Sequence, residues 1–203
     1  MDYFFIADIL GMIAFSISGF LVGLRNKLDL LGLVIASSLT ALGGGILRDV
    51  ILNKTPFTFI EYYPALTVLT TISFAFIFEH FRHDNIEKKW IFVMSDTVGL
   101  VAFSITGTML ALHAEFNVFG VIFLSFITAV GGGVLRDVMI NQVPSVLISD
   151  FYGSIALIVA TLLYTLHHFD FLNSYTISSV AFFSVALRLI AFKKHWHLPK
   201  LQK

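Results

Sequence analysis

The chain has 203 residues, of which 57% are hydrophobic and 13% charged, and its mean hydropathy is +0.88. Soluble domains are about 45–50% apolar and about 25% charged, so a water-soluble fold and a disordered chain are both excluded. The absence of cysteine excludes a disulfide scaffold, and the net charge of +0 offers no basic surface for nucleic acid. We therefore expect an all-α polytopic membrane protein with one transmembrane domain, residues 1–203.

Seven apolar stretches each reach the length of about 20 residues that a helix needs to cross the hydrocarbon core. The first is expected to stay in the protein, because Arg25, Asn26 and Lys27 follow it where a cleavable signal would have small residues. The joining segments are short, which favours one compact bundle. The seven expected helices cover residues 4–24, 30–52, 60–80, 90–112, 118–140, 147–166 and 174–192.

Basic residues gather on one side of this arrangement. An odd number of crossings places the two ends of the chain on opposite sides of the membrane, and only Lys54 lies outside the spans on the N-terminal side. Cytoplasmic loops carry the excess of Lys and Arg. The C-terminus is therefore expected in the cytoplasm and the N-terminus outside. The nine basic residues of the C-terminal side are Arg25, Lys27, Arg82, Lys88, Lys89, Lys193, Lys194, Lys200 and Lys203.

An internal repeat dominates the sequence. GGGILRDV at residues 43–50 recurs as GGGVLRDV at 131–138, and the same offset of 88 aligns residues 7–56 with 95–144, with 21 of 50 positions identical. Three expected helices separate each element from its copy, so the second unit should be inverted in the membrane relative to the first. We expect repeat one over about 4–88, repeat two over about 90–172, a seventh helix over about 174–192 and a cytoplasmic tail, 193–203.

Each repeat has three consecutive glycines inside its second expected helix. A glycine costs a helix about 1 kcal/mol relative to alanine, so the triplets are expected to break both helices. The carbonyl groups released at 41–43 and 129–131 would suit a cation, and nearby hydroxyls would line its path. The alternative is that small residues let the helices pack closely and the hydroxyls satisfy the backbone. The glycines are Gly43, Gly44, Gly45, Gly131, Gly132 and Gly133, and the hydroxyl residues are Ser37, Thr40, Ser125 and Thr128.

Two Arg–Asp pairs follow the triplets, Arg48 with Asp49 and Arg136 with Asp137. An ionisable side chain inside the membrane costs about 2.5–3.5 kcal/mol on insertion scales and marks a functional site by default. We expect the arginines to act as gates or electrostatic barriers in a pore, with the aspartates orienting them. The alternative is that the pairs lie at the membrane interface and hold the repeats together.

Asp8 and Asp96 occupy equivalent positions near the starts of the first and fourth expected helices. A carboxylate there either belongs to a vestibule that attracts cations or stabilises the positive end of the helix dipole. Both interpretations stay open.

No enzyme signature lies inside the expected helices. The sequence has no phosphate-binding loop, no dinucleotide fingerprint and no Ser/His/Asp set within them. The seven histidines lie in loops or the tail without the spacing of metal ligands. We therefore expect no catalysis, no resident cofactor and no metal site.

The doubled GGGxLRDV motif at 43–50 and 131–138, in two three-helix repeats followed by a seventh helix, resembles the trimeric intracellular cation channel family, in its prokaryotic branch. The resemblance implies a homotrimer in a bacterial inner membrane, in contact with its lipids. It also implies one pore per protomer, between helices two and five near the glycines, that passes monovalent cations, chiefly potassium. Bound lipid is a further expectation, although Arg48-Asp49-Val50 replaces the Lys-Glu-Val lipid-contact motif of the animal members.

Three functions compete at this stage. The first is the potassium channel. The second is a secondary transporter of a small zwitterion such as glycine, whose carboxylate would meet half-helices beginning at Ile46 and Val134 or pair with Arg48 or Arg136. The third is a scaffold that transports nothing, in which the glycines serve packing alone.

Overall fold

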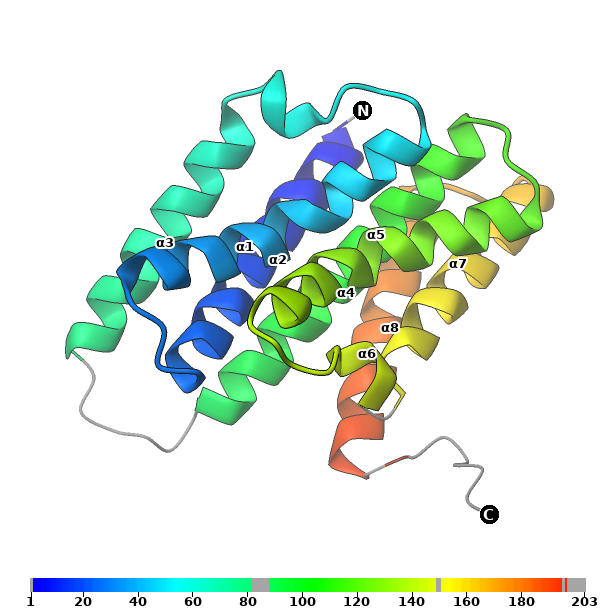
Figure 1. Ribbon diagram of the computed structural model, residues 1–203. Helices are drawn as coiled ribbons and strands as arrows, with labels where there is room; N and C mark the ends of the chain where they lie inside the picture. Colours follow the sequence, from blue (N-terminus) through cyan, green and yellow to red (C-terminus); the bar gives the residue numbers. More distant parts are fainter. Residues whose placement is uncertain (1, 82–87, 149–150, 195, 197–203) are drawn as a thin grey trace, which may run out of the picture.

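The computed structural model describes residues 2–81, 88–148, 151–194 and 196, and within them the fold is entirely helical (Figure 1). Seven of its α-helices have 16 residues or more, and α6 has four. Arg82, Lys200 and Lys203, which contributed to the expected charge bias, lie outside the described residues. The elements are α1 (Asp2–Arg25), α2 (Leu30–Ile51), the 3-10 turn η1 (Phe57–Phe59), α3 (Tyr63–Phe81), α4 (Lys88–His113), α5 (Val118–Met139), α6 (Ser145–Ile148), α7 (Gly153–His168) and α8 (Ser174–Lys193).

In the part of the chain that the structure describes, five helices have the length and hydropathy needed to cross a membrane, and two shorter ones are also apolar. The largest difference from the expected spans is at the sixth, where a short α6 comes first and α7 starts only at Gly153. The cause is local: the Asp137 carboxylate accepts hydrogen bonds from the backbone and side chain of Ser145 and starts α6 after Pro144. The five longer segments are Phe4–Arg25, Leu30–Ile51, Lys89–His113, Val118–Met139 and Ser174–Lys193; the shorter ones are Tyr63–Glu79 and Gly153–His168.

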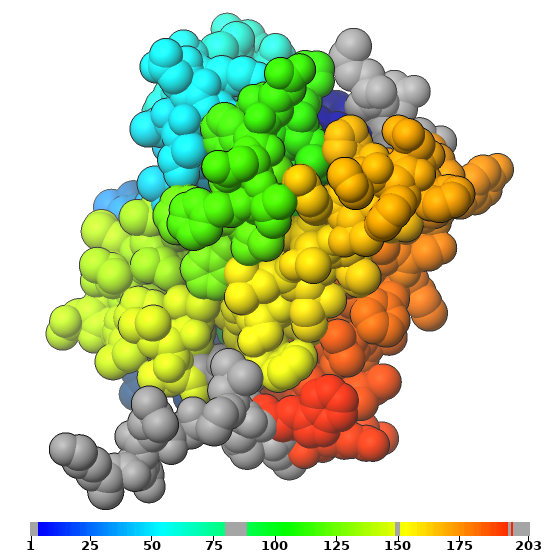
Figure 2. All heavy atoms as spheres, turned by 90° about the vertical axis from the view of Figure 1, so that its right-hand side faces the viewer, coloured from blue at the N-terminus to red at the C-terminus, as the bar shows by residue number. Residues whose placement is uncertain are grey.

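Four helices form the core of the bundle. α1 packs against α4, α2 packs against α5, and each of α1 and α4 also packs on the helix that follows it. α3 covers α1 and α2, whereas α7 covers α4 and α5. α8 has no counterpart in the first half and packs on α4 and α7, and Figure 2 shows α7 and α8 side by side on one face.

The two halves repeat each other in local detail. α2 and α5 are capped by the side chains of Asp29 and Asn117, each of which accepts a hydrogen bond from the backbone N–H three residues on. After the same two helices, Asn53 and Asn141 adopt left-handed backbone conformations with φ of 54° and 56°. Asparagine tolerates this region better than most residues do. The duplication seen in the sequence therefore extends to the ends of the helices.

The glycine triplets do not break α2 or α5. Both helices run unbroken through them, and no described glycine has a positive φ. The predicted breaks, the carbonyls released at 41–43 and 129–131, and the half-helices beginning at Ile46 and Val134 are therefore wrong.

The reason is a close crossing of α2 with α5. A Cβ atom on Gly44 would overlap the carbonyl oxygen of Thr128, and a Cβ atom on Gly132 would overlap that of Thr40. Packing between backbones at this distance offsets the poor helix propensity of glycine. The close-packing alternative is thus what the structure shows.

A second reciprocal contact joins α1 to α4. The rings of Phe15 and Phe103 meet edge to face with centroids 5.2 Å apart, and both residues are 1% exposed. Each ring also occupies the space where a Cβ atom would stand on a glycine of the other helix, Phe103 at Gly11 and Phe15 at Gly99. The middle of the four-helix core is therefore closed by two aromatic rings on one side and by glycine backbone on the other.

Candidate functional site

Three buried charged side chains and one half-buried tyrosine meet in the first half. At the end of α2, Arg48 donates from Nε to Asp49 at 2.8 Å and from Nη1 to Asp8 of α1 at 3.4 Å. The hydroxyl of Tyr63, at the start of α3, donates to the other oxygen of Asp8 at 3.4 Å. We call Asp8, Arg48, Asp49 and Tyr63 the first cluster.

The first cluster is tied to the turn that follows α2. The second carboxylate oxygen of Asp49 accepts a hydrogen bond from the backbone N–H of Phe57 at 2.9 Å. The guanidinium carbon of Arg48 lies 5.2 Å from the ring centroid of Phe57 and 5.7 Å from that of Phe4. These aromatic faces favour the cation and cover it, which is why Arg48 is only 2% exposed.

The second half repeats this Arg–Asp geometry. Arg136, also 2% exposed, binds one oxygen of Asp137 through both Nε, at 2.8 Å, and Nη2, at 2.7 Å. The other oxygen of Asp137 accepts the Ser145 N–H at 2.8 Å, as Asp49 accepts that of Phe57. Among the described residues, Nη1 of Arg136 has no hydrogen-bond partner. One buried donor of this site is therefore unused.

Asp96 of α4 takes the place of Asp8 but has different neighbours. Ser18 of α1 donates to it at 3.0 Å, and it interacts with Arg136, Tyr152 and Arg188. The guanidinium carbon of Arg188 lies 5.2 Å from the ring centroid of Tyr152. We call Asp96, Arg136, Asp137, Tyr152 and Arg188 the second cluster.

The second cluster thus has a guanidinium that the first lacks, supplied by α8. Neither Arg188 nor Tyr152 was among the residues expected from the sequence. A signal for Arg188 was present, because it is the only charged residue of the apolar stretch 174–192, and ionisable residues in such stretches are functional candidates.

The four expected hydroxyl groups are fully buried but do not contact the charged groups. Thr40 and Thr128 each donate to the carbonyl four residues earlier, both at 2.6 Å. Ser37 does the same at 2.8 Å, whereas Ser125 donates to Ser104 of α4 at 2.9 Å. In this conformation the hydroxyl groups satisfy helix carbonyls at the α1–α2 and α4–α5 contacts.

The two clusters lie at opposite ends of the four-helix core. The first is near the N-terminal end of α1 and the C-terminal end of α2, and the second is near the corresponding ends of α4 and α5 (Figure 1). Phe15 and Phe103 lie in the apolar middle. The core therefore has a charged, hydrogen-bonded site at each end and a closed centre.

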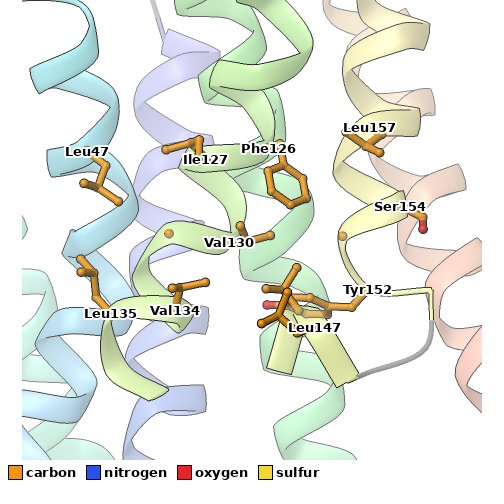
Figure 3. A pocket seen from close by; sticks show the side chains of 13 residues that line it. Leu47, Phe126, Ile127, Val130, Val134, Leu135, Leu147, Tyr152, Ser154 and Leu157 are labelled. Carbon is orange, nitrogen blue, oxygen red and sulfur yellow. The ribbon is translucent and has the colours of Figure 1, made fainter. Parts of the chain in front are cut away.

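A separate pocket of about 410 Å³ lies beside the second cluster, between α2, α5, α6 and α7. In Figure 3 the side chains of Val130, Leu147 and Tyr152 converge on it. Of the described residues that line it, Tyr152 is the only one it shares with the cluster, and none is charged. This pocket is suited to an apolar chain rather than to an ion.

Comparison with a protein family reproduces the internal repeat. The family model described as Glycine transporter matches this chain over residues 5–80 and again over 93–168. The two matches are 88 residues apart, the same offset as the doubled motif.

Similar membrane proteins occur in bacteria. A UPF0126 membrane protein of Vibrio cholerae is 31% identical over 195 residues, which cover 96% of this chain and 81% of the relative. The UPF0126 inner membrane protein YadS of Escherichia coli is 29% identical over 194 residues, which cover 95% of this chain and 93% of the relative. This chain is accordingly an integral membrane protein.

Solved structures agree over almost the whole chain. One, from work on conductance through TRIC cation channels, has a TM-score of 0.87 and 32% identity, and covers 98% of this chain and 97% of its own. The trimeric intracellular cation channel orthologue from Rhodobacter sphaeroides has a TM-score of 0.87 and 27% identity. The match covers 96% of this chain and 100% of the orthologue. The fold, the repeated match and the relatives lead to one conclusion: this chain belongs to the trimeric intracellular cation (TRIC) channel family, in its prokaryotic branch.

Proposed function

We propose that this protein is a channel for monovalent cations, chiefly potassium, that works as a homotrimer with one pore per protomer in a bacterial inner membrane. The observation that carries the proposal is the pair of buried Arg–Asp clusters at opposite ends of one four-helix core. Buried charge is costly in a membrane and is kept where it serves a transport path. The similarity to structures described as cation channels supports the same function.

We propose a topology of seven crossings in which the second repeat is inverted relative to the first. Reciprocal contacts, Gly44 with Thr128 and Gly132 with Thr40, are those expected of two similar halves related by a twofold axis. The excess of basic residues assigns the C-terminus to the cytoplasm and the N-terminus to the outside.

The pore is proposed to run between α2 and α5, next to the glycine triplets. Because these helices touch at Gly44 and Gly132, conduction requires them to move apart at the crossing. Glycines without Cβ atoms would let the backbones slide and hinge there. Ser37, Thr40, Ser125 and Thr128 would then be able to turn their hydroxyl groups toward the path.

Arg48 and Arg136 are the proposed gates, one at each end of the path. Asp49 and Asp137 orient them through the bonds described above, and Asp8 and Asp96 form the vestibules that attract cations. An arginine released from its partners would place a positive charge in the path and oppose a cation.

The test is potassium current through the purified protein in planar bilayers. We expect a non-saturating potassium current, and a severalfold change in conductance or open probability when Arg48 or Arg136 is replaced by glutamine. Lys54→Gln, a change in a loop residue, is the matched control and should conduct as the wild type does. If both arginine variants conduct as the wild type does, the proposed gating role of Arg48 and Arg136 is wrong. If the wild-type protein passes no current, the proposed channel function is wrong.

A secondary transporter of a small zwitterion such as glycine is the second candidate. The description of the family model favours it, and so does the buried Nη1 donor of Arg136, which a carboxylate would satisfy. Saturable glycine uptake into liposomes that contain the purified protein, without independent potassium conductance, would establish the transporter. If the protein shows neither potassium current nor glycine uptake, the third function, a scaffold that transports nothing, is favoured.

The ring pair Phe15–Phe103 is expected to restrict the proposed pore. Replacing Phe103 by alanine removes one of the two rings that close the centre of the core, so potassium conductance should rise severalfold. Phe182→Ala is the matched control, because that ring is 80% exposed on α8. Single-channel recording of both variants checks the prediction, and equal conductance in the two would contradict it.

A further inference from the structure

A groove of about 540 Å³ lies where both halves of the protein meet α8. Its walls come from the last turns of α1, the first turns of α4 and the end of α8. These three helix ends lie together at one end of the bundle (Figure 1). The groove is lined by Leu21, Val22, Leu24, Arg25, Lys89, Phe92, Val93 and Phe192.

The groove combines an apolar floor with two cations. Arg25 and Lys89 are both exposed, and the Lys89 Nζ lies 5.6 Å from the ring centroid of Phe192. Among the described residues that line the groove, none is acidic. Two positive charges above an apolar surface, at the end of a membrane helix bundle, are complementary to an anionic headgroup with a hydrocarbon chain beneath it.

The internal repeat shows that these cations are not part of the repeated fold. The offset of 88 aligns Arg25 with His113 and Lys89 with Met1, so the other end of the bundle has no equivalent pair of Lys and Arg. Phe192 belongs to α8, which has no counterpart either. The basic groove is therefore an addition at one end of an otherwise repeated structure.

We propose that this groove binds one anionic glycerophospholipid from the leaflet at that end of the bundle. The phosphate pairs with Arg25 and Lys89, and an acyl chain lies along Leu21, Phe92 and Phe192. Guanidinium groups bind phosphate oxygens through paired hydrogen bonds, and the ammonium of Lys89 adds a second charge. A lipid held there contacts α1, α4 and α8 at once and fastens the two halves to the last helix.

Trp90 provides a direct readout of this site. Its ring meets that of Phe192 edge to face with centroids 5.7 Å apart, beside the groove. The chain has two tryptophans, so a Trp196→Phe background leaves Trp90 as the only one. Brominated lipid chains quench tryptophan fluorescence on contact, which reports occupancy whether or not the protein conducts ions.

The experiment compares quenching of Trp90 in phosphatidylcholine vesicles that contain a small fraction of dibrominated phosphatidylglycerol or of dibrominated phosphatidylcholine. We expect a preference for phosphatidylglycerol of roughly thirtyfold, which is the combined effect of two basic residues at a membrane surface. The preference should vanish in Arg25→Gln/Lys89→Gln and persist in Arg25→Lys/Lys89→Arg, which keeps both charges and the insertion signal. Lys54→Gln should behave as the wild type does.

Each other outcome overturns the proposal. Equal quenching by the two lipids would show that only the apolar floor matters, and a preference that survives in the double glutamine variant would place the anionic lipid elsewhere. Competition by millimolar inorganic phosphate would assign the site to a free anion. Absence of quenching by either lipid, with cross-linking of a cysteine placed at Leu21 between protomers, would show that a second copy of the chain covers the groove.

Discussion

Gly132→Ala is expected to force α2 and α5 apart and to destabilise the protein strongly. The added Cβ atom would overlap the carbonyl oxygen of Thr40, and a backbone oxygen in a helix has no rotamer through which to give way. Overpacking a well-packed core costs about 1–3 kcal/mol. The better helix propensity of alanine, about 1 kcal/mol, offsets only part of this cost. Thermal unfolding of the purified protein in detergent measures the effect.

The neighbouring glycine supplies the matched control. A Cβ atom on Gly133 would find only Nη2 of Arg136, 3.8 Å away, so Gly133→Ala fits without movement. This variant should unfold at the wild-type temperature or above it, because alanine favours the helix by about 1 kcal/mol. Gly44→Ala, the counterpart of Gly132→Ala, should be as damaging as that change. Similar unfolding temperatures for Gly132→Ala and Gly133→Ala would show that the triplet does not serve close packing.

Asp137→Ala is expected to be at least as damaging, through charge rather than shape. Asp137 neutralises Arg136 and also holds the start of α6 through the backbone N–H and the hydroxyl of Ser145. Its removal leaves the Arg136 guanidinium buried with one counter-charge fewer. Loss of one partner of a buried ion pair costs about 3–5 kcal/mol. The yield of folded protein and its unfolding temperature are the measurements.

Two variants separate the roles of this carboxylate. Asp137→Asn keeps an oxygen for Ser145 but removes the charge. If its unfolding temperature is close to that of Asp137→Ala, the loss of stability comes from the ion pair with Arg136. Glu61→Ala removes an exposed carboxylate and should leave the unfolding temperature unchanged. A small effect of Asp137→Ala would mean that water already reaches Arg136 and that the site is not sealed.

Most of the helices and the repeat were predictable because both depend on local patterns. Hydropathy located the ends of α2 and α5 within a residue or two, and the offset of 88 paired Asp8 with Asp96 and Arg48 with Arg136. The structure places each aspartate beside the arginine of its own half. The sequence pattern alone does not predict this contact. Their roles in conduction remain proposals.

The glycine triplets show why local reasoning failed. Helix propensity describes an isolated helix, whereas the stabilisation of Gly44 and Gly132 comes from a partner helix about 88 residues away in the sequence. Nothing in the residues near a triplet tells whether such a partner will be there. The sequence therefore favoured a break where the backbones of α2 and α5 pack directly against each other.

Arg188 and Tyr152 were missed for a different reason. Arg188 lies on α8, outside the repeat, so no alignment of the halves assigns it a position. Tyr63 and Tyr152 perform the same task for Asp8 and Asp96 but are 89 residues apart, because Tyr63 is the first residue of α3 whereas Tyr152 directly precedes α7. An alignment without gaps at offset 88 pairs Tyr63 with Phe151 instead.

The makeup of the two clusters has a consequence for biogenesis. All members of the first cluster precede residue 82, so Asp8 can find Arg48 and Tyr63 as soon as the first three helices have left the ribosome. The second cluster also takes a hydrogen bond from Ser18 and a guanidinium from Arg188, and so is completed only when the last helix enters the bilayer. Asp96 and Arg136 therefore lack one of their charged partners until synthesis is almost finished. A chain truncated before Arg188 never completes the second cluster, and we expect membrane proteases to degrade it.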